Sequence, residues 1–140
     1  MKYSGERYSF EIPDRMKDLI CVKRGPRRAD IVLLAEDDPA CSGILVSLRC
    51  RRTRIRRPDD FTELLGTLTG SAGAQPDHGA PPSARDGTGC GPGRFFLYAA
   101  YGREGAVSEM NEDLYWRLRD RLWSIFDSIE AVDGYSWEKA

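Results

Sequence analysis

Hydrophobic and polar positions alternate along the first part of the chain, a pattern typical of half-buried β-strands. Tyr8, Phe10 and Ile12 share one face of a predicted strand that ends at Pro13. A hairpin and a fourth strand are predicted from apolar segments at residues 19–25, 29–36 and 43–50, which turn sequences such as "RGPRR" and "EDDPACSG" separate. Four consecutive strands favour an antiparallel sheet.

The pattern changes to a helical period at residues 58–68. Apolar side chains recur there three and four positions apart, at Phe61, Leu64, Leu65 and Leu68. Asp59 or Asp60, just before them, is a suitable N-cap residue. We predict a short amphipathic helix. The next apolar segment, "RFFLYAAYG" at residues 94–102, is bulky on both faces and predicts a fifth strand in a sheet that is covered on both sides.

The longest helical pattern lies near the C-terminus, at residues 111–130. One buried stripe is predicted from Leu118, Leu122, Ile125 and Ile129, widened by Tyr115 and Phe126. Trp116 and Trp123 lie seven residues apart on a flank of this stripe. They either pack over the sheet edge or form an aromatic contact for a partner, so both are candidate partner-binding residues.

Between these elements, residues 70–93 are rich in Gly, Ala, Pro and Ser and show no periodicity. This composition predicts a long mobile loop. A chain of 140 residues suits one domain with a real core, so we expect residues 1–140 to form a single domain that carries this loop. No apolar run approaches the roughly 20 residues that span a bilayer, and no membrane span is expected.

The N-terminus lacks the apolar core of a signal peptide. The predicted location depends on whether Met1 is the native start: cytoplasmic if it is, and extracytoplasmic if a signal peptide has been removed. Cys21 and Cys50 lie in predicted strands and are expected to pack as small apolar groups. Cys41 and Cys90 lie in predicted loops and are disulfide candidates in an exported protein.

Arginine is concentrated in the stretch "RCRRTRIRRPDD", residues 49–60. Even-numbered positions from Ile44 to Cys50 share one face of the predicted strand. Continuing that face would place three arginines at core positions: Arg52, Arg54 and Arg56. Buried unpaired guanidinium groups are very unfavourable, so the strand is predicted to leave the core near Arg51.

Three interpretations of these arginines are open. The simplest is that they are solvated or paired with nearby acidic residues, namely Glu36, Asp37, Asp38, Asp59 and Asp60. The second is that their planar donor groups bind an anionic partner protein or a second copy of the chain. The third is nucleic-acid binding, which the net charge of -1 and the lack of interleaved aromatic residues argue against. We therefore expect no nucleic-acid partner.

No residue pattern in the sequence predicts catalysis, a metal site or a cofactor. His78 is the only histidine and lies in "AQPDHGAPP", without a second ligand or base beside it. The cysteines form no C-x-x-C pair of the kind that binds structural zinc. The sequence "GTGCGPG" precedes a strand instead of opening a helix, unlike a phosphate-binding loop. We expect no catalytic residue, no metal and no cofactor.

Four segments together resemble a known family: "YSGERYSFEIPDRM", "GILVSLRCRR", "RFFLYAAYG" and "NEDLYWRLRDRLWSIFDSIE". They are similar to small bacterial proteins of the PsbP-like and DcrB-like superfamily. The resemblance implies an α/β (α+β) fold, a three-layer α-β-α sandwich around a mainly antiparallel sheet, with a long C-terminal helix. It also implies a non-enzymatic module that binds a partner. The alternative is a small hydrolase or transferase with a cleft beneath residues 70–93.

Overall fold

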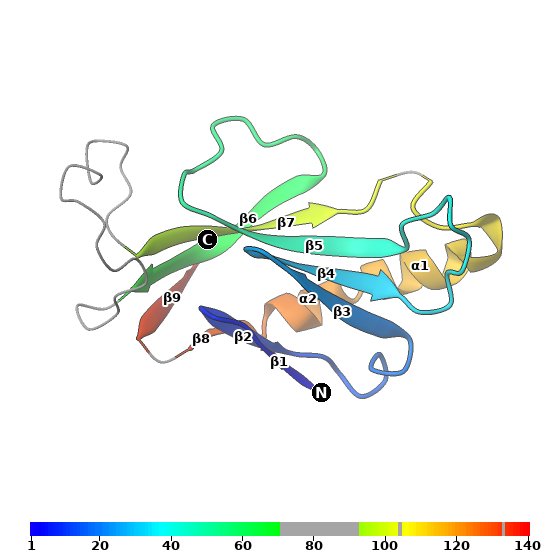
Figure 1. The fold of residues 1–140 in the computed structure, drawn as a ribbon, viewed down its shortest axis with the longest axis horizontal. Helices are drawn as coiled ribbons and strands as arrows, with labels where there is room; N and C mark the ends of the chain where they lie inside the picture. The colour runs from blue at the N-terminus through cyan, green and yellow to red at the C-terminus, as the bar shows by residue number, and fades with distance from the viewer. Residues whose placement is uncertain (71–92, 104, 133) are drawn as a thin grey trace.

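The computed structural model describes residues 1–70, 93–103, 105–132 and 134–140, which form two antiparallel sheets and short helices (Figure 1). Of these residues, 44% lie in strands and 14% in helices. The larger sheet has the order β3 (Ile20–Gly25), β4 (Arg28–Leu33), β5 (Ile44–Arg51), β7 (Arg94–Tyr101), β6 (Thr62–Gly70) and β9 (Tyr135–Lys139). The smaller sheet has the order β1 (Lys2–Ser4), β2 (Tyr8–Glu11) and β8 (Glu130–Ala131).

The core lies between the apolar face of the larger sheet, β2 and the helical segment. That segment consists of a 3-10 turn and two helices: η2 (Glu109–Asn111), α1 (Glu112–Arg119) and α2 (Leu122–Phe126). Side chains from every part are 1% exposed or less, among them Leu48 and Leu97 of the larger sheet, Phe10 of β2 and Ile125 of α2. Full burial of such a side chain contributes about 1.5–3 kcal/mol. This shared core holds the two sheets together.

The strands that the alternating pattern predicts are present. β2, the β3–β4 hairpin, β5 and β7 all form, and β3, β4, β5 and β7 pair antiparallel in that order. The prediction that the chain leaves the core near Arg51 is confirmed, because β5 ends there. The chain then reaches the outer face of the larger sheet at Ile55, whose N–H donates a 2.8 Å hydrogen bond to Tyr98 Oη.

The expected three-layer α-β-α sandwich with a long C-terminal helix is wrong. The C-terminal segment forms two short helices and continues as β8 and β9, and the described structure is mostly β. The helical path breaks at Arg121, whose φ of -104° and ψ of 3° lie outside the α-helical region. The predicted stripe is still buried, with exposures of 3% or less at Tyr115, Leu118, Leu122 and Ile125. An apolar period shows which side faces the core but not where the axis changes direction.

The short helix predicted at residues 58–68 is also wrong, because most of this segment belongs to strand β6. A β-bulge shifts the register between Leu64 and Gly66. The extra residue lets Leu65 and Leu68 both point into the core although they are three positions apart. That spacing imitates a helical period. β6 is in fact a central strand, paired with β7 on one side and β9 on the other.

Residues 71–92 lie outside the described ranges, and with them His78, Cys90 and nearly all of the predicted loop at 70–93. The residues that flank this segment are adjacent, since the Gly70 N–H donates a 2.8 Å hydrogen bond to the Gly93 carbonyl. Within the part of the chain that the structure describes, no helix is both long and apolar enough to cross a membrane.

Candidate anion-binding site

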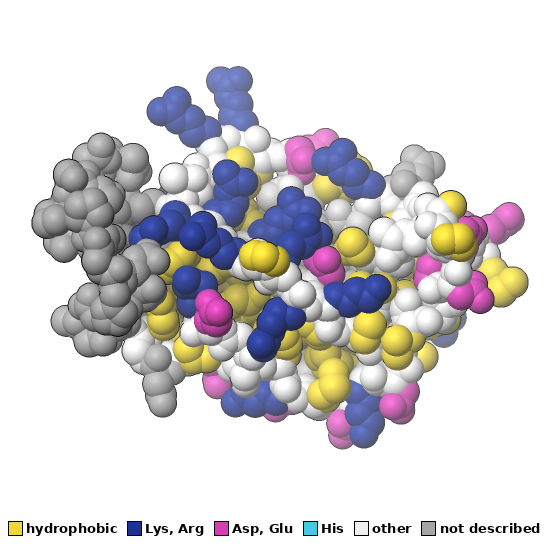
Figure 2. All heavy atoms as spheres, in the orientation of Figure 1, with side chains coloured by type: hydrophobic (Ala, Val, Ile, Leu, Met, Phe, Trp, Pro, Cys, Tyr) yellow, Lys and Arg dark blue, Asp and Glu magenta, His cyan; other side chains and the backbone are white. Residues whose placement is uncertain are grey.

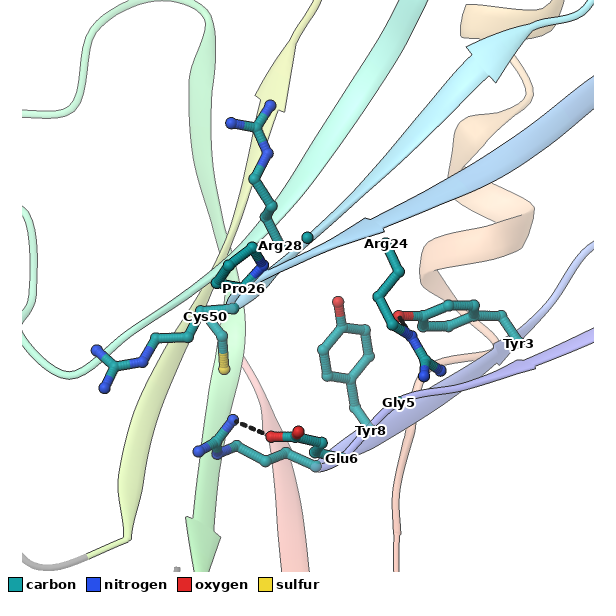
Figure 3. Close-up of a pocket in the computed structure, with 11 residues that line it drawn as sticks. Tyr3, Gly5, Glu6, Tyr8, Arg24, Pro26, Arg28 and Cys50 are labelled. Atoms are coloured by element: carbon teal, nitrogen blue, oxygen red, sulfur yellow. Dashed lines mark hydrogen bonds and ion pairs between the residues drawn. The ribbon is translucent and has the colours of Figure 1, made fainter. Parts of the chain in front are cut away.

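Three segments that are distant in the sequence meet at one end of the larger sheet: the β1–β2 turn, the β3–β4 turn and the end of β5 (Figure 3). They enclose a cavity of about 260 Å³. Four arginines line it: Arg7, Arg24, Arg27 and Arg28. Among the described lining residues, Glu6 is the one acid. We call this space the arginine cavity.

The β3–β4 turn places Arg27 at the cavity through an unusual backbone conformation. The turn consists of Pro26 and Arg27, and Arg27 has a φ of 56°. A proline followed by a residue with positive φ corresponds to a type II turn, whose second central position favours Gly or Asn. Within the described chain, Arg27 is the one non-glycine residue with positive φ. An arginine held in this conformation suggests a role for its side chain.

Arg7 is largely buried against the ring of Phe95. Its guanidinium carbon lies 4.0 Å from the centroid of the Phe95 ring, and its side chain is 15% exposed. Nη1 lies 3.4 Å from the Glu6 carboxylate, whereas the buried Nε–H has no acceptor among the described residues. A buried donor without an acceptor costs about 1–3 kcal/mol. Arg7 therefore carries a buried donor that lacks an acceptor among the described residues.

The other two arginines of the cavity already have partners. Arg24 donates from Nε to Tyr3 Oη at 3.2 Å and from Nη2 to the Ser4 carbonyl, and the Tyr3 hydrogen bond raises the pKa of Arg24. Arg28 forms hydrogen bonds of 3.0–3.2 Å with both oxygens of Asp30. The charge of Arg28 is therefore largely compensated, and Arg7, Arg24 and Arg27 determine the positive potential of the cavity.

Tyr8 and Cys50 contribute neutral groups to the same space. Figure 3 shows the Tyr8 ring pointing from β2 towards the β3–β4 turn, with Cys50 beside that turn. Burial raises the pKa of the Tyr8 phenol well above its usual range. Burial also raises the pKa of the Cys50 thiol to about 11, although Arg7 and Arg27 oppose the shift. Both groups are protonated at neutral pH, so neither is a base or a nucleophile there.

A second cavity, of about 310 Å³, lies on the outer face of the larger sheet. Its arginines are Arg49 and Arg103, and its acid is Asp59. Arg103 Nη2 lies 2.8 Å from Asp59 Oδ2, so that this pair is compensated. With two arginines and one acid, the second cavity has a smaller excess of positive charge than the arginine cavity, which has four arginines and one acid.

The residues predicted as a site from the sequence are dispersed. Arg52 is half-buried near the arginine cavity, with its guanidinium carbon 5.6 Å from the Phe95 centroid, whereas Arg54 and Arg56 are exposed in the following loop. Trp116 on α1 is 49% exposed and Trp123 on α2 is 64% exposed. None of these five residues lines the arginine cavity.

Sequence reasoning missed the four arginines of the cavity. Arg24, Arg27 and Arg28 stand in "KRGPRR", which was interpreted only as a turn. The signal that was available is an arginine after proline at a two-residue hairpin turn, where glycine is usual. Arg7 carries no local signal, because its contact with Phe95 joins the β1–β2 turn to β7 of the larger sheet.

Searches against protein-family models, curated proteins and solved structures returned no match to this chain. The resemblance to the PsbP-like and DcrB-like superfamily thus stays a prediction. In the described ranges, no group of three or more His, Cys, Asp or Glu side chains is placed to hold a metal ion.

Proposed function

We propose that this protein is a non-enzymatic binding module that holds a carboxylate of a partner protein in the arginine cavity. The observation that carries the proposal is that four arginines and one acid line a single cavity, together with the buried Arg7 Nε–H that lacks an acceptor among the described residues. Guanidinium groups bind carboxylates through paired, charge-assisted hydrogen bonds. A bound carboxylate would supply the missing acceptor and offset the mutual repulsion of the arginines.

The shape and lining of the cavity favour an acidic side chain over a small inorganic anion. The aromatic rings of Tyr3 and Tyr8 and the ring of Pro26 form part of its wall. Such a wall suits the methylene groups of a glutamate, whose carboxylate would reach the arginines. The cavity is also larger than a carboxylate alone requires, so the backbone that carries the acidic side chain has room at its mouth.

The chemistry of the cavity supports binding over catalysis. Its neutral groups, Tyr8 and Cys50, keep their protons at neutral pH, and its charged groups are mostly arginines, which do not exchange protons in that range. The alternative hydrolase or transferase would use a cleft beneath residues 70–93, most of which lie outside the described ranges. No observation favours that alternative.

The proposal is tested by titrating the ¹⁵N-labelled protein with an acetylated, amidated diglutamate peptide. We expect shifts of the backbone amide signals of Gly5, Gly25 and Cys50, which line the cavity. A diglutamine peptide of the same shape lacks the charges and should leave these signals in place. Arg7→Gln should weaken diglutamate binding about tenfold, because a buried charge-assisted hydrogen bond is worth roughly 1.5–3 kcal/mol.

Arg117→Ala is the matched control, since Arg117 is an exposed arginine on α1 that lines neither described cavity. This variant should bind the diglutamate peptide as the wild type does. Equal shifts with diglutamate and diglutamine, or equal losses in Arg7→Gln and Arg117→Ala, would show that the cavity is not a carboxylate site.

A further inference from the structure

The arginine cavity opens onto a wider basic surface. Figure 2 shows Lys and Arg side chains gathered over the tips of β3, β4 and β5 and the loop that follows them. Five exposed arginines belong to β5 and the loop that follows it: Arg49, Arg51, Arg54, Arg56 and Arg57. We call these five residues the arginine band.

The cavity and the band are physically continuous. Arg28, which lines the cavity, stands opposite Arg49 in the antiparallel register of β4 and β5. Arg7 of the cavity and Arg52, the residue after β5, both lie over the Phe95 ring. Their guanidinium carbons are 4.0 Å and 5.6 Å from its centroid. A ligand that leaves the cavity in the direction of β5 would therefore meet the band directly.

Two of the acidic residues that were candidates for neutralising these arginines have other partners. The Ser108 N–H donates a 2.5 Å hydrogen bond to Glu36 Oε1, which ties Glu36 to the start of η2. Asp59 pairs with Arg103, although it also interacts electrostatically with Arg49 of the band. In the described part of the chain, no ion pair joins Arg51, Arg54 or Arg56 to an acidic side chain.

Basic side chains predominate on this surface, although the positive and negative charges of the whole chain nearly cancel in number. The formal net charge is -1. Figure 2 shows several acidic side chains at the end of the molecule that carries α1, and single acidic side chains among the basic ones. A surface on which basic side chains predominate attracts anionic partners and accelerates their association, even in a protein of near-zero net charge.

We infer that the partner of the arginine cavity is a run of consecutive acidic residues, which places one carboxylate in the cavity and continues in extended form across the arginine band. This inference rests on the proposed function and specifies the partner segment. Arg49 and Arg51 are both exposed, two positions apart on β5. Alternate side chains of an extended peptide repeat at about 6.8 Å, the same spacing as alternate residues of a strand. Alternate acidic side chains of the run therefore match Arg49 and Arg51.

A single-stranded nucleic acid is a poorer match to the same surface. Proteins that bind single strands combine basic grooves with exposed aromatic rings on which bases stack. The exposed rings in the described residues are Phe61, Trp116 and Trp123. Both tryptophans lie on the helices, and Arg103 already lies 5.1 Å from the Phe61 centroid. The arginine band itself presents no ring for stacking.

The test compares diglutamate with octaglutamate, both acetylated and amidated, by calorimetry at about 50 mM NaCl. Seven overlapping Glu-Glu frames give octaglutamate a statistical gain of about sevenfold. If the band contributes, we expect a gain of about thirtyfold or more, because each further exposed ion pair adds a modest increment. The variant Arg51→Gln/Arg54→Gln/Arg56→Gln should lower the gain to about sevenfold and leave diglutamate affinity within about twofold of wild type.

The matched control is Lys17→Gln/Arg117→Gln/Arg121→Gln, which removes the same number of charges at exposed positions outside both cavities. This control should keep the thirtyfold gain. The affinity of the wild type for octaglutamate should also fall more steeply with salt than its affinity for diglutamate, a comparison that needs no variant.

The outcomes separate the two proposals. Diglutamate binding without an additional gain for octaglutamate would overturn the acidic-run inference and leave the proposed function standing. Failure of both peptides to bind would overturn both. An oligothymidylate of eight nucleotides that binds more tightly than octaglutamate at the same salt concentration would overturn the inference in favour of a nucleic-acid ligand.

Discussion

The backbone N–H of Cys50 donates a 2.8 Å hydrogen bond to the carbonyl oxygen of Arg27. This bond fixes the β3–β4 turn against the end of β5 and holds Arg27 at the arginine cavity. In that position Arg27 has a φ of 56°, and this left-handed conformation costs a non-glycine residue roughly 1–2 kcal/mol. The turn therefore combines local strain with the placement of a charged side chain.

Arg27→Gly should make the protein more stable and the ligand complex weaker. Glycine adopts positive φ without strain, although its greater freedom in the unfolded chain offsets part of the gain, so we expect the free energy of unfolding to rise by about 0.5–1 kcal/mol. Diglutamate affinity should fall about fivefold because one guanidinium is lost. Urea unfolding and the NMR titration measure the two effects.

Arg27→Ala is the control that separates backbone from side chain. It removes the guanidinium but keeps a side chain at positive φ, so peptide affinity should fall as in Arg27→Gly without the gain in stability. Wild-type affinity in either variant would remove Arg27 from the site.

The stability contributed by Cys50 should decrease at high pH. Its thiol pKa is raised to about 11 in the folded protein, whereas an exposed thiol in the unfolded chain titrates near 8.5–9. The contribution is complete below about pH 8.5 and is lost as the pH rises towards 11, because the unfolded state releases a proton that the folded state retains. The stability advantage of wild type over Cys50→Ala should shrink by about 2 kcal/mol between pH 8 and 10.5.

Urea midpoints of both proteins across this pH range measure the effect, and the subtraction removes the titration of groups that they share. A stability difference between wild type and Cys50→Ala that stays constant with pH would contradict the burial of the Cys50 thiol, because it would mean that solvent reaches the thiol freely.

Gly66→Ala tests the strand assignment of β6. A Cβ at this position would lie 2.5 Å from the Glu138 carbonyl oxygen and 2.5 Å from the Trp137 ring. We expect a loss of about 1–3 kcal/mol of stability, because β9 has to move away. In a helix the same substitution would stabilise the protein by up to about 1 kcal/mol. The sign of the change in the urea midpoint therefore distinguishes the two structures.

The sequence predicted strands well where one face is buried and the alternation is unbroken, as in β2 and β5. It failed where a local irregularity changes the period. The bulge between Leu64 and Gly66 made a central strand look helical. The break at Arg121 divided one continuous apolar stripe between two helices. Neither irregularity has a distinct local signature, because pairing with distant strands and packing on the sheet determine it.

The candidate site was predictable only in part. Alternation along β5 correctly placed the end of the strand at Arg51 and identified the segment after this strand as rich in exposed arginine. It could not show that Arg7 and Arg27 meet beside Cys50, since these residues come together only when the smaller sheet packs against the larger one. Sites that depend on such long-range contacts are not encoded in local spacing.

The most direct test of the carboxylate site observes the Nε–H signal of Arg7 itself. The signal can be assigned from its disappearance in Arg7→Lys, in ¹⁵N spectra of the arginine side chains. On addition of diglutamate we predict a downfield shift and slower exchange with water, as the buried donor gains a charged acceptor. Diglutamine should leave the signal in place. An Arg7 Nε–H signal that does not respond to saturating diglutamate would contradict the central claim that the arginine cavity binds a carboxylate.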